Sequence, residues 1–166
     1  EVGYDKFHSN YNNIYQVIAH RDFNNQVFSD RSMVLPLAAA LEKNSPQIKN
    51  AVVTTHPQQH VVAYRDKKLT KQGYTVSEHF FSVFSWKFIK GNASAALPDA
   101  YTIVLTQSTA KALFGNEEPI NKVIRIDNSY DAKVSAILAG VPDNSTFQFD
   151  YINMFNYSGD VEKQAM

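Results

Sequence analysis

The chain has 166 residues, 44% of them hydrophobic and 13% aromatic, which is ample material for a packed core. It contains no cysteine, so disulfide scaffolds, thiolate metal sites and cysteine catalysis are excluded. Its 16 lysines and arginines balance its 16 aspartates and glutamates without a basic block, which argues against nucleic-acid binding because that needs a positive face.

The first third of the sequence predicts helical and extended segments in turn. Apolar residues within 2–13 recur at steps of three and four, which is typical of one face of a helix. Residues 15–19 alternate as in a strand, and the pair at 24–25 is a turn signal. Residues 35–43 predict a helix with Pro36 in its first turn.

The middle of the chain predicts strands and an aromatic core. Residues 48–55 have the composition of a strand, and residues 60–66 and 69–76 predict a hairpin over a turn at 66–68. Five aromatic side chains follow within nine residues: Phe80, Phe81, Phe84, Trp86 and Phe88. So dense a cluster favours core packing over the alternative, a platform on which a ligand stacks.

Residues 102–126 predict one compact unit of strand, helix and strand. Residues 102–105 are β-branched and apolar, and Thr106 stands where a helix N-cap belongs. Three apolar residues follow at helical spacing: Ala110, Leu113 and Phe114. Gly115 is placed to end the helix, and residues 123–126 begin a new strand.

The end of the chain predicts two more extended segments. A turn at 128–129 leads into a strand over 132–141, and residues 142–145 form a second turn by composition. Residues 147–151 alternate aromatic and polar side chains, as in a half-exposed strand. Residues 158–166 carry little pattern, and we expect them to fray.

These elements together predict an α+β fold, a mixed β-sheet with a few short helices in two lobes. No stretch approaches the roughly 18 apolar residues of a membrane-spanning helix. The sequence begins at Glu1 rather than at methionine, so we expect an excised fragment or a processed product.

Two sets of residues could carry chemistry. His56 and His60 have the spacing of a helical metal pair, but Pro57 and the strand-like flanks favour a loop. Asp5 and His8 would share a helix face, either as a proton switch or as a partly buried histidine bonded to a neighbour. The chain lacks a nucleophile elbow and a phosphate-binding glycine loop, so we predict no catalytic residue, cofactor, metal or ATP site.

Four segments resemble, in order, the MacB-like periplasmic domain of FtsX-family ABC transporter permeases: residues 4–17, 80–92, 104–122 and 142–145. Within the third segment, Asn121 stands where the family usually has glycine, and both residues tolerate positive φ. The motif residues, to which we assign structural roles, are Tyr4, Asp5, Phe7, His8, Phe80, Phe81, Phe84, Gly91, Leu105, Thr106, Ala110, Phe114, Gly115, Pro119, Lys122, Pro142 and Ser145.

The resemblance implies that residues 1–166 are one extracytoplasmic domain fragment of an inner-membrane protein, on the periplasmic side. The transmembrane and C-terminal parts would lie outside it. Such a domain does no bond chemistry. By changing conformation, it would couple cytoplasmic ATP hydrolysis either to export, including efflux, or to regulation of an extracytoplasmic partner by mechanotransmission. Its implied partners are its own transmembrane helices, a second permease copy, a cytoplasmic ABC ATPase and a periplasmic adaptor or outer-membrane protein.

Two other functions stay open from the residues. One is a small-molecule sensor or binding domain, lined by residues 80–88. The other is a hydrolase with a site assembled around His56, His60 and His79. Stabilisation by a ligand would favour the first, and metal-dependent turnover of esters would favour the second.

Overall fold

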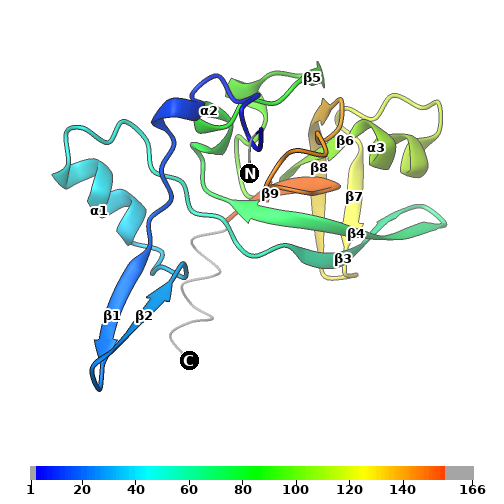
Figure 1. Ribbon diagram of the computed structural model, residues 1–166. Coiled ribbons are helices and arrows are strands. Elements are labelled where there is room, and N and C mark those ends of the chain that lie inside the picture. Colours follow the sequence, from blue (N-terminus) through cyan, green and yellow to red (C-terminus); the bar gives the residue numbers. More distant parts are fainter. Residues whose placement is uncertain (1–2, 156–166) are drawn as a thin grey trace.

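In the computed structural model, which describes residues 3–155, six strands pair in a closed ring (Figure 1). In order around the ring they are β3 (Gln58–Tyr64), β4 (Lys67–Val76), β9 (Tyr151–Met154), β6 (Thr102–Thr106), β8 (Tyr130–Leu138) and β7 (Val123–Ile126). The ring closes because β7 pairs with both β8 and β3. The pairs β4–β9 and β6–β8 are parallel and the other four are antiparallel, so the predicted mixed sheet is confirmed.

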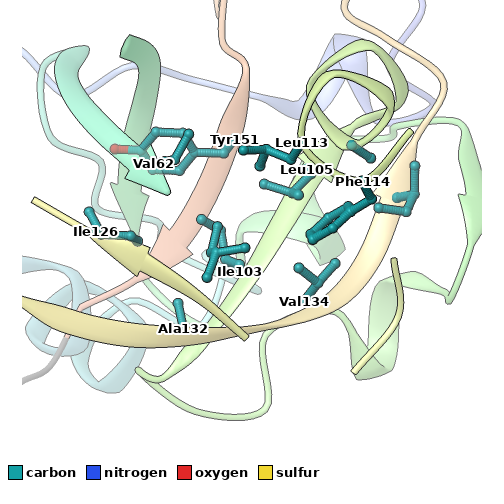
Figure 2. Close-up of a cluster of buried hydrophobic side chains, with 12 residues drawn as sticks. Val62, Ile103, Leu105, Leu113, Phe114, Ile126, Ala132, Val134 and Tyr151 are labelled. Carbon is teal, nitrogen blue, oxygen red and sulfur yellow. The ribbon is translucent and has the colours of Figure 1, made fainter. Parts of the chain in front are cut away.

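The inside of this barrel is filled by apolar side chains from several strands (Figure 2). Strand alternation sends every second residue inward, as in β7, where Ile124 and Ile126 are buried and their neighbours are exposed. Helix α3 (Gln107–Phe114) adds Leu113 and Phe114 to the same core. The inward-facing strand residues include Val62, Ile103, Leu105, Ala132, Val134 and Tyr151.

A second core covers the outer face of the barrel. The aromatic segment after β4 forms the short helix α2 (Phe80–Val83) and packs against outward-facing side chains of β4, β6, β8 and β9. This core includes Tyr74, Val76, Phe80, Phe81, Trp86, Val104, Ala136, Leu138, Phe149 and Ile152. With one core inside the barrel and one outside, all five residues of β6 are buried. The interpretation of residues 80–88 as core is confirmed, and the exposed stacking platform is not formed.

A small second lobe stands apart from the barrel in Figure 1. It consists of the hairpin of β1 (Ala19–Phe23) and β2 (Gln26–Asp30), whose strands pair only with each other, and of helix α1 (Leu37–Asn44). The predicted turn at 24–25 is confirmed, since both asparagines have positive φ, as the tightest hairpin turns require. The hairpin leaves Phe23 68% exposed.

The first predicted helix is wrong. Residues 4–10 form successive turns, and only η1 (Tyr11–Asn13), a 3₁₀ turn, is helical. Asp5 has φ of 57°, which takes the chain out of helical geometry and aims its carboxylate at the turn 142–146. Tertiary contacts therefore set this segment: Phe7 and His8 pack against Trp86, whereas Tyr4 and Tyr11 are exposed. The strand predicted over 15–19 starts only at Ala19.

Four further segments differ from prediction. Residues 48–55 form a single bridge, Thr54 to Val76, instead of a strand. The β3–β4 turn lies at 65–66, one residue earlier than expected, and β8 ends at Leu138. The last strand begins at Tyr151, and directly before it the Asp150 carboxylate accepts hydrogen bonds from Lys71 and Gln72 of β4. The expectation for residues 158–166 lies outside the described residues.

The remaining elements are short. β5 (Phe88–Lys90) pairs with the end of β8, and η2 (Ala93–Ala95) is a 3₁₀ turn capped by the Asn92 side chain. Within residues 3–155, no helix combines the length and the apolar character needed to cross a bilayer.

Candidate functional site: an N-terminal clamp on the barrel

Residues 3–10 are fastened to the turn 142–146 and to residues 82–85, and we call this set of contacts the N-terminal clamp. Asp5 forms its first half. The Asp5 N–H donates to the Asn144 carbonyl at 2.9 Å, and the Thr146 N–H donates to Asp5 Oδ1 at 2.8 Å. The Thr146 hydroxyl donates to Asp5 Oδ2, and the Asn144 amide donates to the Gly3 carbonyl at 2.8 Å. The first and last motif segments are therefore joined directly.

His8 forms the second half of the clamp. Its side chain is buried, with the residue 3% exposed, and its Nδ1 lies 3.0 Å from the Ser85 nitrogen and 3.1 Å from the Ser85 oxygen. The Ser9 and Ser85 hydroxyls are 2.7 Å apart. The His8 ring also packs against aromatic rings, edge-on to Phe84 and Trp86. This half joins the first motif segment to the second.

The electrostatics of His8 are those of a buried imidazole. Burial lowers its pKa, against the opposing effects of the Ser85 backbone and the Asp5 charge. Its Nε2 is buried, has no hydrogen-bond partner among residues 3–155, and lies 4.0 Å from Asp5 Oδ1. The sequence placed Asp5 and His8 together on a helix; the structure brings them together through a turn. His8 is therefore a buried histidine that is hydrogen-bonded to a neighbouring residue.

The predicted strand, helix and strand unit is confirmed. The Thr106 hydroxyl accepts from the Thr109 N–H at 3.4 Å and caps α3, and Gly115 ends the helix at φ 63°. Asn121 has φ of 65°, a left-handed conformation that asparagine and glycine both tolerate. Leu105, Ala110 and Phe114 lie in the barrel core.

Lys122 and Pro119 belong to the turn that follows α3. Lys122 Nζ lies 2.8 Å from a Glu117 oxygen, and Glu117 also pairs with Arg65 at 2.8 Å. The hydrogen bond from Lys122, with a further effect of Arg65, holds the pKa of Glu117 below its ordinary value, and the same bond raises the pKa of Lys122. The cluster is solvent-exposed and connects this turn to Arg65 in the β3–β4 turn.

The other motif residues act on the backbone or in packing. Gly91 has φ of 76°, and a Cβ there would lie 2.8 Å from that of Ala136, so only glycine fits without a shift. The Pro142 carbonyl accepts from the Ser145 N–H at 3.0 Å, and the buried Ser145 hydroxyl accepts from the Phe147 N–H at 3.2 Å. Tyr4 is exposed, Phe7 is half-buried and Phe80, Phe81 and Phe84 lie in the outer core.

The role of Asp150 was not predicted from the sequence. Its carboxylate accepts from Lys71 Nζ at 3.1 Å, from the Gln72 N–H at 3.0 Å and from the Thr109 hydroxyl at 3.3 Å. It therefore ties β4 and α3 to the start of β9. Its only sequence signal was its polar place in an alternating segment, which does not reveal partners 41 and 79 residues away.

The candidate histidines do not converge. His60 contacts the carboxylate of Asp127, whereas His79 lies 3.5 Å from Glu78 and 3.8 Å from Glu42. Across residues 3–155, no group of three or more His, Cys, Asp or Glu side chains could hold a metal ion. Burial opposes ionisation of Asp127, but hydrogen bonds from His60 and the Val61 N–H lower its pKa overall.

Two hollows on the surface of residues 3–155 are open to solvent. One, of about 370 Å³, lies beside Tyr101, Val123 and Lys133. A second, of about 230 Å³, lies between α3 and β5. Neither holds a motif residue of the clamp, and neither is lined by the buried aromatic segment that the binding-domain alternative requires.

These features define an α+β domain built on a closed mixed barrel, with a small second lobe and the two ends of its motif set clamped together. A family model described as the MacB-like periplasmic core domain matches residues 3–161. Because this match spans nearly the whole chain, the chain belongs to the MacB-like periplasmic core domain family. The family is a periplasmic domain of ABC transporter permeases and not a class of enzymes.

Solved structures show the same fold. A domain of a proposed permease protein from Porphyromonas gingivalis matches with TM-score 0.66 and 18% identity, over 80% of this chain and 56% of that one. The periplasmic region of MacB from Actinobacillus actinomycetemcomitans matches with TM-score 0.55 and 22% identity, over 78% and 57%. The extracellular domain of the noncanonic ABC-type transporter YknZ from Gram-positive bacteria matches with TM-score 0.52 and 14% identity, over 68% and 58%.

The matched region is thus little more than half of each of these three structures. None of the curated proteins matches this chain.

Proposed function

We propose that this domain is the periplasmic part of an ABC transporter permease and passes movement between its membrane helices and an extracytoplasmic partner. ATP hydrolysis by a cytoplasmic ATPase would supply the movement, and a second permease copy would complete the working unit. The family match and the fold support this proposal.

The N-terminal clamp is the observation that carries the proposal. Movement that enters through the start of the chain reaches residues 3–10 first. These residues are bonded at Asp5 to the turn before β9 and at His8 to the segment after α2. Both receiving segments pack on the outer core of the barrel. A pull on the start of the chain would therefore move the barrel as a body instead of unravelling a flexible linker.

The location is tested by labelling a single engineered cysteine. The chain has no cysteine of its own, so Tyr101→Cys, at an exposed site, gives one reactive thiol in this domain. In the full permease, with any cysteines elsewhere replaced, a membrane-impermeant maleimide should label it in intact cells with a permeable outer membrane. Labelling only after the inner membrane is broken would overturn the periplasmic assignment.

The coupling is tested by loosening the clamp. Asp5→Asn weakens two hydrogen bonds to Thr146, whereas Asp143→Asn changes an exposed carboxylate in the same turn and serves as the matched control. Spin labels on the two domains of the purified permease–ATPase complex would report their separation with and without ATP. We expect the ATP-dependent shift to shrink in Asp5→Asn while ATP hydrolysis persists. An unchanged shift in Asp5→Asn would contradict transmission through the clamp.

A further inference from the structure

One carboxylate oxygen of the clamp faces two donors. Asp5 Oδ1 accepts from the Thr146 N–H at 2.8 Å and lies 4.0 Å from His8 Nε2. Nε2 is buried and has no hydrogen-bond partner among the described residues. Asp5 itself keeps 28% of its side chain exposed, so the carboxylate has room to move toward either donor.

The other nitrogen of His8 has a choice of partners on Ser85. In neutral imidazole with the proton on Nε2, Nδ1 accepts from the Ser85 N–H at 3.0 Å. When a proton from solvent binds Nδ1, both ring nitrogens become donors and Nδ1 turns to the Ser85 carbonyl at 3.1 Å. Nδ1 therefore has a hydrogen-bond partner on Ser85 in each protonation state. What changes at Nε2 is the positive charge that the ring gains on protonation.

We propose that His8, Asp5 and Thr146 form a proton-operated latch in which protonation of His8 draws Asp5 away from Thr146 and frees the turn 142–146 from the start of the chain. The attraction between a buried imidazolium and a carboxylate at this separation competes directly with a hydrogen bond to a neutral amide. The latch is closed while His8 is neutral.

The direction of the pH response follows from the surroundings of His8. The charged group that faces it is Asp5, on its own segment, and it is the carboxylate within ion-pair distance among residues 3–155. From the packed segment 84–86 it meets the rings of Phe84 and Trp86 and the backbone of Ser85. Because burial outweighs the Asp5 charge, the pKa of His8 falls below the ordinary 6.5, so the latch opens only in acid.

The fluorescence of Trp86 can report the protonation of His8. Trp86 is the single tryptophan of the chain, and its ring centroid lies 5.1 Å from that of His8, edge-on. A charged imidazolium so close should quench its fluorescence. The test titrates the 166-residue chain from about pH 7.5 to about pH 4.5, below the ordinary range of histidine, and follows Trp86 fluorescence together with hydrogen exchange at the Thr146 amide.

We expect both signals to change with one shared midpoint below 6.5. Exchange of the Thr146 amide, corrected for intrinsic rate, should accelerate by about tenfold. His8→Gln should abolish both transitions, and His56→Gln, at an exposed histidine outside the clamp, should leave both in place. In Asp5→Asn the fluorescence transition should move to lower pH and the Thr146 transition should disappear.

Three results would overturn the latch. The Thr146 amide could titrate with a midpoint unlike that of Trp86, it could stay protected through the fluorescence transition, or both transitions could persist in His8→Gln. If His8→Gln fails to fold, the comparison of the two midpoints in the unmodified chain still decides. These outcomes do not depend on transport, so the proposed function and the latch can fail separately.

Discussion

At the scale of the residue, two glycines mark where the backbone comes closest to a neighbouring chain segment. Gly91 leaves β5 at positive φ and faces Ala136 of β8, while Gly73 of β4 lies under the ring of Tyr151. The two cases differ in cause. At Gly91 both conformation and space require glycine, whereas at Gly73 space alone does.

We expect Gly91→Ala to lower the free energy of unfolding by about 2 kcal/mol, because the added Cβ is both strained and in contact with Ala136. Urea denaturation of the 166-residue chain measures this loss in the free energy of unfolding. Gly3→Ala is the matched control, since Gly3 also has positive φ but a Cβ there meets nothing within 4 Å. Equal losses in the two variants would rule out the contact with Ala136 as a cause.

At the scale of the element, the helix α3 shows which parts of a fold a sequence reveals. Its cap at Thr106, its glycine stop at Gly115 and its buried face are all local patterns, and all were predicted and confirmed. The segment 4–13 has an equally regular apolar spacing, yet it is not an α-helix. There Asp5 leaves helical geometry to reach Thr146, a contact that no local pattern encodes.

Thr106→Ala should cost about 1 kcal/mol of stability, because the first turn of α3 loses the oxygen that accepts from the Thr109 N–H. Thr106→Ser keeps this oxygen and should recover most of the loss. Thermal unfolding followed by circular dichroism compares the two variants. If serine is as damaging as alanine, the buried methyl group and not the cap is what the position needs.

At the scale of the whole molecule, the barrel closes through contacts between distant segments. The composition and alternation of the strands predicted a mixed sheet, but nothing in them predicted that β7 would pair with both β8 and β3. The N-terminal clamp was likewise not predicted from the sequence. Its motif residues were singled out individually from the family resemblance, and only the structure shows that Asp5 meets Thr146 and that His8 meets Ser85. Non-local pairing leaves no local pattern to recognise.

Gly73→Ala tests how tightly the ring is closed. A Cβ at Gly73 would lie 2.2 Å from the Tyr151 ring, so the buried ring or one of the two strands must shift, and we expect a loss of about 2–3 kcal/mol. In the background of Tyr151→Leu, where the ring is absent, the same change should cost much less. Chemical denaturation of the unmodified chain, the two single variants and the double variant gives the coupling free energy between the two substitutions. Additive losses would mean that Tyr151 is not the obstacle.

The position of β9 in the ring also bears on the order in which the protein can be made. Among residues 3–155, β9 (Tyr151–Met154) comes last in sequence, yet it lies between β4 and β6, with one parallel and one antiparallel neighbour. Until it is in place, β4 and β6 expose facing edges and the barrel has no interior. When the chain is synthesised from its N-terminus, the sheet therefore stays open until residue 154 is available and the barrel can close. Folding during synthesis must either protect those two edges or begin only when β9 has appeared.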